Sequence, residues 1–222
     1  HNLVPENLDI AQAELQSLNQ QWKDIEFNAK ELHEEGLVFQ NTYFDQNFVC
    51  DYSDKNTDQI IFSDHDRFEK VKTWDEGLDS SFANICEEMS PEQIEEHFNL
   101  SEKIDYLIGH QYELPSGGNI MFGKTDALTA IDVNTGSAKR FDTNREAIQL
   151  IAKLIKLKNI SGKVVIDPVA SDHNTLRKLV GMLKNEFRDD LSITNVYGYT
   201  RGGLLELSRS RNDRSIDELN LN

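Results

Sequence analysis

Three polar side chains in the second half of the chain lie where two strand-like segments end. The stretch "DALTAIDVN", residues 126–134, reads as a strand that carries Asp132 and Asn134 near its end. Because alternate residues of a strand share a face, these two side chains would point the same way. A second apolar run, "GKVVID", ends in Asp167. Two carboxylates with an amide beside one of them form an oxygen-ligand set that suits Mg²⁺.

The segment between the two aspartates has the length and pattern of a strand–helix–strand crossover. Residues 143–158 repeat apolar side chains on one helical face, at Ala147, Leu150, Ile151, Leu154 and Leu157. A crossover makes its two strands parallel and brings their carboxyl ends to one edge of the sheet, where open α/β sheets bind ligands. The pattern therefore predicts a metal site formed by Asp132 and Asp167. The alternative is that each aspartate only ends a strand or caps a helix.

The elements around this crossover predict an α/β fold. A second amphipathic helix is expected at 172–188, and "SITNVYG" and "GGLLELSRSR" read as the last two strands. With the strand expected after "LPSGG", the order in the second half is β-β-α-β-α-β-β, which is typical of α/β proteins.

The first half is expected to be richer in helix. Residues 8–34 carry apolar side chains at steps of three and four and predict one long helix. The short runs "LVFQ", "FVCDY" and "QIIFSD" are strand candidates, and Ser63 or Asp64 would cap the helix that follows them. In "SPEQIEEHF", Ser90 and Gln93 predict a capping box at the start of another helix.

Charge is distributed very unevenly along the 222 residues. Residues 1–113 carry 26 acidic and 7 basic side chains, a net charge of −19, whereas residues 114–222 carry 13 and 16, a net charge of +3. The overall charge of −16 argues against a nucleic-acid partner, but the second half does not share that excess. The asymmetry predicts two modules, an acidic front subdomain at 1–113 and a catalytic subdomain at 114–222.

The remaining composition predicts a cytoplasmic protein. Cys50 and Cys86 are isolated and lack metal-ligand spacing, so they are expected to be buried free thiols. The six histidines form no pair with metal-ligand spacing. Apolar runs are far shorter than the roughly 20 residues of a membrane helix, and the start shows no signal-peptide pattern, so no membrane association is expected.

Five blocks of the second half occur in a fixed order between Leu114 and Arg211. They are "LPSGG", "DALTAIDVN", "TNREA", "SGKVVID" and "GLLELSRSR". Their content and spacing closely resemble the catalytic region of the ribonuclease E/G family, and the first half resembles the helix-rich stretch that precedes it. The resemblance implies a DNase-I-like catalytic subdomain at 114–222, preceded by a helix-rich α/β subdomain that is a remnant of the family's sensor and RNase-H-like region.

The resemblance also implies an activity and a cofactor. Members of the family hydrolyse single-stranded RNA at internal sites and leave 5′-phosphate ends, with Mg²⁺ as cofactor. Asp132 and Asp167 match the two Mg²⁺-binding aspartates, and Asn134 matches the asparagine that orients the first of them. The metal would activate a water and stabilise charge on the phosphate.

Several departures from the family pattern leave a second reading open. The OB-fold RNA-binding domain, the Arg-Thr element of the 5′-monophosphate sensor and the paired cysteines of the zinc link have no counterpart in this sequence. Pro168 and Ala170 stand where the family often has Phe and Asp, and Asp126 replaces its usual Glu. The chain thus resembles a shorter, divergent member. The alternative function is a catalytically weakened relative that acts as an RNA-binding or protein-interaction module.

Basic residues beside the proposed site predict how RNA would be held. Lys139, Arg140 and Arg145 follow the Asp132 strand and are predicted to contact phosphates. For Lys153, Lys156 and Lys158 a solvated helix face explains the charges equally well, and Arg209 beside Glu206 is expected to be structural. Expected partners are single-stranded RNA, a second copy not linked by zinc, and a basic protein or a missing RNA-binding domain at the acidic front half.

Overall fold

The computed structural model describes residues 8–32, 35–36, 38, 44–53, 57–76, 82–136 and 140–219. The chain forms two compact units, residues 1–97 and 98–222. This division falls before the predicted boundary at residue 113, because the strand Gln111–Glu113 pairs with a strand of the second unit. The assignment of 1–113 and 114–222 as separate domains stays a prediction.

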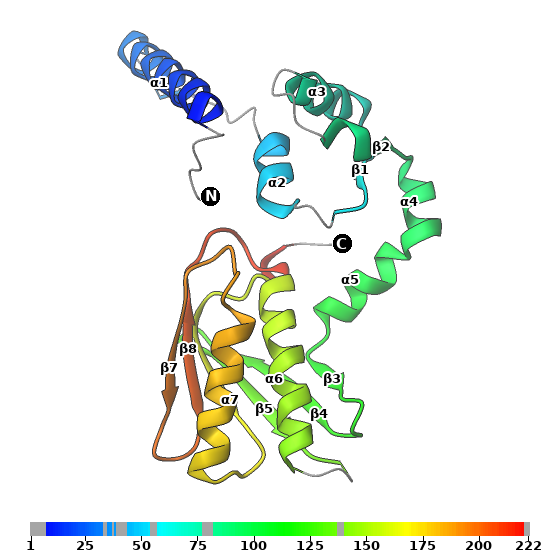
Figure 1. The fold of residues 1–222 in the computed structure, drawn as a ribbon, viewed down its shortest axis with the longest axis vertical. Coiled ribbons are helices and arrows are strands. Elements are labelled where there is room, and N and C mark those ends of the chain that lie inside the picture. Colours follow the sequence, from blue (N-terminus) through cyan, green and yellow to red (C-terminus); the bar gives the residue numbers. More distant parts are fainter. Residues whose placement is uncertain are drawn as a thin grey trace. The chain divides into compact units, whose positions relative to one another are not determined.

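The described part of the first unit contains helices and a small parallel sheet (Figure 1). Its elements are α1 (Leu8–Glu31), α2 (Phe44–Tyr52), β1 (Ile60–Phe62), α3 (His65–Glu76), the 3₁₀ helix η2 (Phe82–Ile85), β2 (Cys86–Glu88) and α4 (Pro91–Phe98). Strand β1 pairs with β2 in parallel. The predicted long helix is confirmed as α1.

The helix starts predicted from capping residues are confirmed in this unit. The Gln93 backbone N–H donates to Ser90 Oγ at 3.3 Å, and the Ser90 backbone N–H donates to Gln93 Oε1 at 2.8 Å. This is the reciprocal arrangement of a capping box. Asp64 caps α3, since its carboxylate accepts a hydrogen bond from the Arg67 backbone N–H.

The strand predicted at "FVCDY" is wrong, because this stretch is the end of α2. Phe48 and Tyr52, four residues apart, stack with ring centroids 4.6 Å apart. A helix brings residues at that spacing together and a strand does not, and the short apolar run concealed this periodicity. Of "LVFQ", only Val38 belongs to the described residues, and it is in no strand.

The second unit is a six-stranded mixed sheet with two long helices. Its elements are α5 (Leu100–Ile108), β3 (Gln111–Glu113), β4 (Asn119–Lys124), β5 (Thr129–Asn134), α6 (Arg140–Leu157), β6 (Gly162–Asp167), α7 (His173–Glu186), β7 (Thr194–Tyr199), β8 (Leu205–Arg209) and the 3₁₀ helix η3 (Ile216–Glu218). The strand order is β3-β4-β5-β6-β8-β7. Strands β5 and β6 are parallel and the other neighbours antiparallel. The predicted α/β fold is confirmed.

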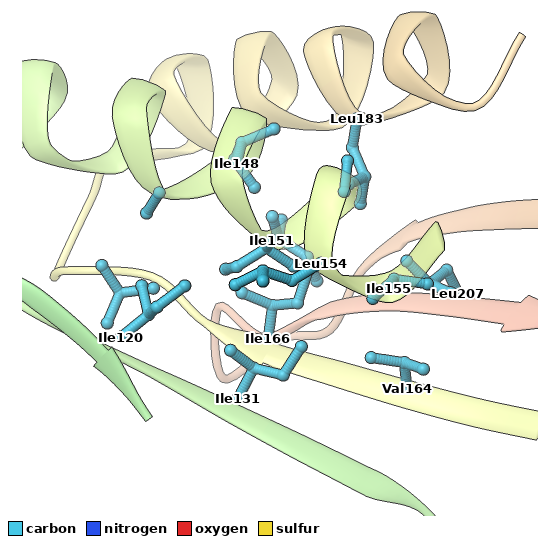
Figure 2. Close-up of a cluster of buried hydrophobic side chains, with 14 of the residues drawn as sticks. Ile120, Ile131, Ile148, Ile151, Leu154, Ile155, Val164, Ile166, Leu183 and Leu207 are labelled. Carbon is cyan, nitrogen blue, oxygen red and sulfur yellow. The ribbon is translucent and has the colours of Figure 1, made fainter. Parts of the chain in front are cut away.

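Helices α6 and α7 lie side by side over one face of this sheet (Figure 1). Burial alternates along β5: Thr129, Ile131 and Val133 are buried beneath the helices, while Asp132 and Asn134 are exposed on the opposite face. Figure 2 shows the resulting core, in which isoleucines and leucines of α6 pack onto side chains of β5 and β6. The apolar pattern of each strand therefore decides which face its polar residues occupy.

Membrane insertion receives no support from the helices. Among the residues that the structure describes, none belongs to a helix with both the length and the apolar character needed to cross a bilayer.

Candidate metal centre

Asp132 and Asp167 are direct neighbours in the sheet. They are paired in the register of the parallel strands β5 and β6, and adjacent strands lie about 4.8 Å apart. Both side chains are exposed, and both line a pocket of about 450 Å³. The remaining lining residues come from the segment after β6, the start of α7 and the β7–β8 loop: Pro168, Val169, Ala170, Ser171, Leu176, Gly202 and Gly203, together with Val133. The tertiary structure thus brings the two predicted carboxylates together.

Asn134 holds the side chain of Asp132 in place. Its amide nitrogen Nδ2 donates to Asp132 Oδ2 at 2.9 Å and to Asn119 Oδ1 of the neighbouring strand at 3.3 Å. The contact arises because residues 132 and 134 point to the same side of β5. A side chain that anchors a ligating carboxylate sets the direction of its oxygens. Its part in metal binding stays a prediction.

A tight turn before β4 lies against the loop that leaves β5. A Cβ atom on Gly118 would come within 2.3 Å of the Asn134 carbonyl oxygen, and one on Gly136 within 2.3 Å of the Gly117 carbonyl oxygen. Gly117 itself has φ +81°, which favours glycine. The glycines of "PSGG" thus allow two backbones to approach closely and fix the end of the strand that carries Asp132.

Asn144 positions the segment after β6 that lines the pocket, and sequence reasoning assigned it no role. This α6 side chain is buried and forms a pair of hydrogen bonds with Val169: its Oδ1 accepts from the backbone N–H at 2.8 Å, and its Nδ2 donates to the carbonyl at 3.0 Å. The same amide nitrogen also donates to Ser171 Oγ at 3.0 Å. The block "TNREA" carried this signal, because a buried asparagine in a helix needs partners outside the helix.

Glu146 in the same block holds the turn before β4, which packs against the end of β5. Its carboxylate accepts a hydrogen bond of 2.9 Å from the Ser116 backbone N–H, in the turn that packs against the β5 end. One segment of α6 therefore anchors the loops on both sides of the aspartate pair.

The basic residues predicted to hold RNA differ in how they lie. Arg140 and Arg145 are exposed on the first turns of α6, at the edge of the sheet where β5 ends. Lys139 lies outside the described residues. Because a helix rises 1.5 Å per residue, Lys153 and Lys156 lie roughly 20 and 24 Å along α6 from Arg140. The contact of Lys139, Arg140 and Arg145 with RNA stays a prediction.

Lys158 neither flanks the site nor belongs to a solvated helix face. It is 1% exposed, and its Nζ donates to the Gly109 carbonyl at 3.0 Å and lies 3.5 Å from Asp217 Oδ1. It also lies over the rings of Tyr112 and Phe122. The helical pattern did not reveal this burial, because the partners come from segments distant in the sequence.

Arg209 is structural, as expected, but its partner is Asp190 rather than Glu206. Arg209 donates to both oxygens of Asp190, at 2.8 and 3.0 Å, and also to Asn159 Oδ1 and the Ile160 carbonyl. Burial opposes ionisation of Asp190, but hydrogen bonds from Arg209 and Thr194 outweigh it and lower the pKa of that carboxyl.

The donor set at the pocket fits Mg²⁺. Among the described residues, no group of three or more His, Cys, Asp and Glu side chains is arranged to hold a metal ion. Two exposed carboxylates beside an open pocket are what Mg²⁺ takes, since it keeps several waters and binds one or two carboxylates. Cys86 is only partly buried, and the side chain of Cys50 is outside the described residues.

Comparison with known proteins places the chain in a family. It is similar to Ribonuclease E of Nostoc sp., 28% identical over 221 residues that cover 93% of this chain and 32% of that protein. It is also similar to Ribonuclease G of Escherichia coli (strain K12), 25% identical over 95% of this chain and 46% of that protein. The chain spans between about a third and a half of these relatives. Residues 5–212 match the sequence model of the Ribonuclease E/G family, and the chain therefore belongs to this family.

Proposed function

We propose that this chain is an Mg²⁺-dependent endoribonuclease that hydrolyses single-stranded RNA at internal sites and leaves 5′-phosphate ends. The observation that supports it most is the side-by-side placement of Asp132 and Asp167 in the lining of one pocket, with Asn134 hydrogen-bonded to the first of them. The names of the family's curated relatives, Ribonuclease E and Ribonuclease G, agree with the reaction class.

Each residue of the site would have a distinct role in the reaction. Asp132 and Asp167 would hold the metal, and Asn134 keeps the Asp132 carboxylate oriented. When bound, Mg²⁺ would supply positive charge for the phosphate and acidity for the attacking water in an in-line displacement. Arg140 and Arg145 would contact phosphates beside the cleaved bond, because α6 starts at the same edge of the sheet.

The decisive assay uses a single-stranded, A/U-rich RNA with Mg²⁺ and with EDTA. The parent chain should cut it only with Mg²⁺, and a phosphatase-sensitive 5′ end should appear on the products. Asp132→Asn and Asp167→Asn should each lower the rate at least about 100-fold, since loss of an outer partner alone costs 10- to 100-fold. Asp213→Asn, at an exposed position outside the pocket, is the matched control. Parent-like rates in both site variants would refute the assignment.

The same assay separates the alternative function. The acidic front half, at −19, and the residues Pro168 and Ala170 in the pocket favour a weakened relative that only binds RNA or protein. In that case the parent chain would bind the RNA but leave it uncut with Mg²⁺. Partners at the acidic front half would then be basic, either a protein or an RNA-binding domain.

Two further parts of the proposal concern assembly and location. We propose that any homo-oligomer of this chain forms without zinc, because its two cysteines are isolated in the sequence. We also propose that the protein acts in the cytoplasm, where single-stranded RNA is the substrate. Metal analysis, followed by sizing with and without a chelator, tests the first of these.

A further inference from the structure

Helix α7 carries a row of basic side chains that sequence reasoning did not single out. Arg177 and Lys184 are seven residues apart, and Arg188 follows four residues later in the turn that continues the helix. This spacing puts the three on one side of the helix. All three are exposed, whereas Leu176, Leu179 and Leu183 are buried against the sheet. The row is about 16 Å long at 1.5 Å per residue.

The charges of this row are not neutralised within the described part of the chain. None of Arg177, Lys184 and Arg188 takes part in a salt bridge there; Arg188 donates only to the side chain of Asn185. The acidic residue of α7, Glu186, is two positions beyond Lys184 and so points to another side of the helix. Three aligned, hydrated cations form a surface that suits a polyanion.

The row begins next to one pocket and ends in the lining of another. Leu176, immediately before Arg177, lines the pocket of Asp132 and Asp167. At the other end, Lys184 and Arg188 line a second pocket of about 430 Å³ together with Phe187 and strand residues 194–197. The row therefore runs from beside the pocket of the candidate metal centre to the start of β7.

We infer that the α7 row of Arg177, Lys184 and Arg188 binds the phosphate backbone of single-stranded RNA. This inference rests on the proposed function for its ligand. The row would bind phosphates that lie away from the cleaved bond. The aspartate pair alone does not provide such contacts.

The test compares two triple variants of the full chain. Arg177→Gln, Lys184→Gln and Arg188→Gln remove the row; Lys70→Gln, Lys103→Gln and Lys163→Gln remove three exposed charges elsewhere. Binding of a labelled single-stranded RNA is measured in EDTA across a range of salt. Three lost phosphate contacts should lower the salt slope by about 2 and the affinity at about 0.1 M salt by about 100-fold, from 0.7 per phosphate. The control triple should keep the parent slope, and equal slopes for both triples would overturn the inference.

A second readout separates this inference from the proposed function. With Mg²⁺, the row variant should cut a trinucleotide at the parent rate but lose kcat/KM on a long RNA. If the parent cuts neither RNA while the slopes still differ, the proposed function fails and the binding surface stands. If the row variant instead loses binding to polyglutamate and keeps its RNA affinity, the surface serves an acidic protein and the inference is wrong.

Discussion

Charged side chains at the two ends of the six-stranded sheet differ in whether the fold pairs them. Where β5 and β6 end, Asp132 and Asp167 are exposed and form no salt bridge within the described residues. Where β8 ends, Arg209 and Asp190 are 5% and 3% exposed at their side chains and are fully paired with each other. The first pair of charges remains available to a ligand, whereas the second is satisfied by the fold itself.

This contrast has a physical basis. A buried charge must be paired, because an unpaired one costs several kcal/mol of desolvation. Exposed carboxylates stay hydrated and cost the fold little, even when two of them are adjacent. Charges at the β8 end should therefore control stability, and those at the β5 end should control activity. Four predictions test this division.

Breaking the buried pair should have the largest effect. Arg209→Ala leaves Asp190 buried without its cation and should lower the free energy of unfolding by about 3–5 kcal/mol. Urea denaturation measures it. Arg211→Ala, which removes an exposed partner of Glu218, is the control and should cost no more than about 1 kcal/mol. If Arg209→Ala costs no more than this control, the buried pair does not stabilise the fold.

A methyl group at Gly118 should disturb the site end through the backbone. Gly118→Ala places its Cβ 2.3 Å from the Asn134 carbonyl oxygen, and the turn must move away. A cost of about 1–3 kcal/mol is expected from overpacking, together with slower RNA cleavage. Gly123→Ala is the matched control, because its Cβ would lie 3.8 Å from the nearest atom. Similar stability and rate for both variants would contradict the close approach.

Removal of the Asn144 side chain should affect both properties. Asn144→Ala leaves the N–H and C=O of Val169 without their partners, which costs about 1–3 kcal/mol when the groups stay buried. The loop after Asp167 should loosen, so the rate on RNA should fall even at temperatures where the variant is folded. Asn174→Ala, at an exposed position of α7, serves as control. Unchanged cleavage with lowered stability would restrict Asn144 to a structural role.

Acid should produce the smallest effect, through the buried carboxylate of Asp190. The pKa of Asp190 is lowered, so its stabilising contribution is present above the ordinary Asp value of about 3.9 and is lost as pH falls through the lower, folded-state pKa. Denaturation curves between about pH 5 and 2 should show a steeper loss for the parent than for Arg209→Ala. A parent-like slope in Arg209→Ala would show that Asp190 is not the titrating group.

The sequence by itself determined α6, α7 and the strands from β4 to β8, and it named the residues of the candidate site; α5 and β3 were not predicted. Apolar periodicity predicted these elements, because burial on one face leaves a regular trace in the chain. The period of two in β5 put Asp132 and Asn134 on one side, and the crossover length placed Asp167 beside them. These features are local, or follow from the right-handed crossover that connects two parallel strands.

Only the tertiary structure decided the partners of the long polar side chains. Asn144 reaches Val169, Arg209 reaches Asp190, and Lys158 reaches Gly109, across separations of 19 to 49 residues. Likewise, the sequence did not indicate that residues of α7 line two pockets, and only the structure placed the basic row beside them. Side-chain hydrogen bonds between distant segments leave no periodic signal, since they depend on where the packed core brings the backbones together.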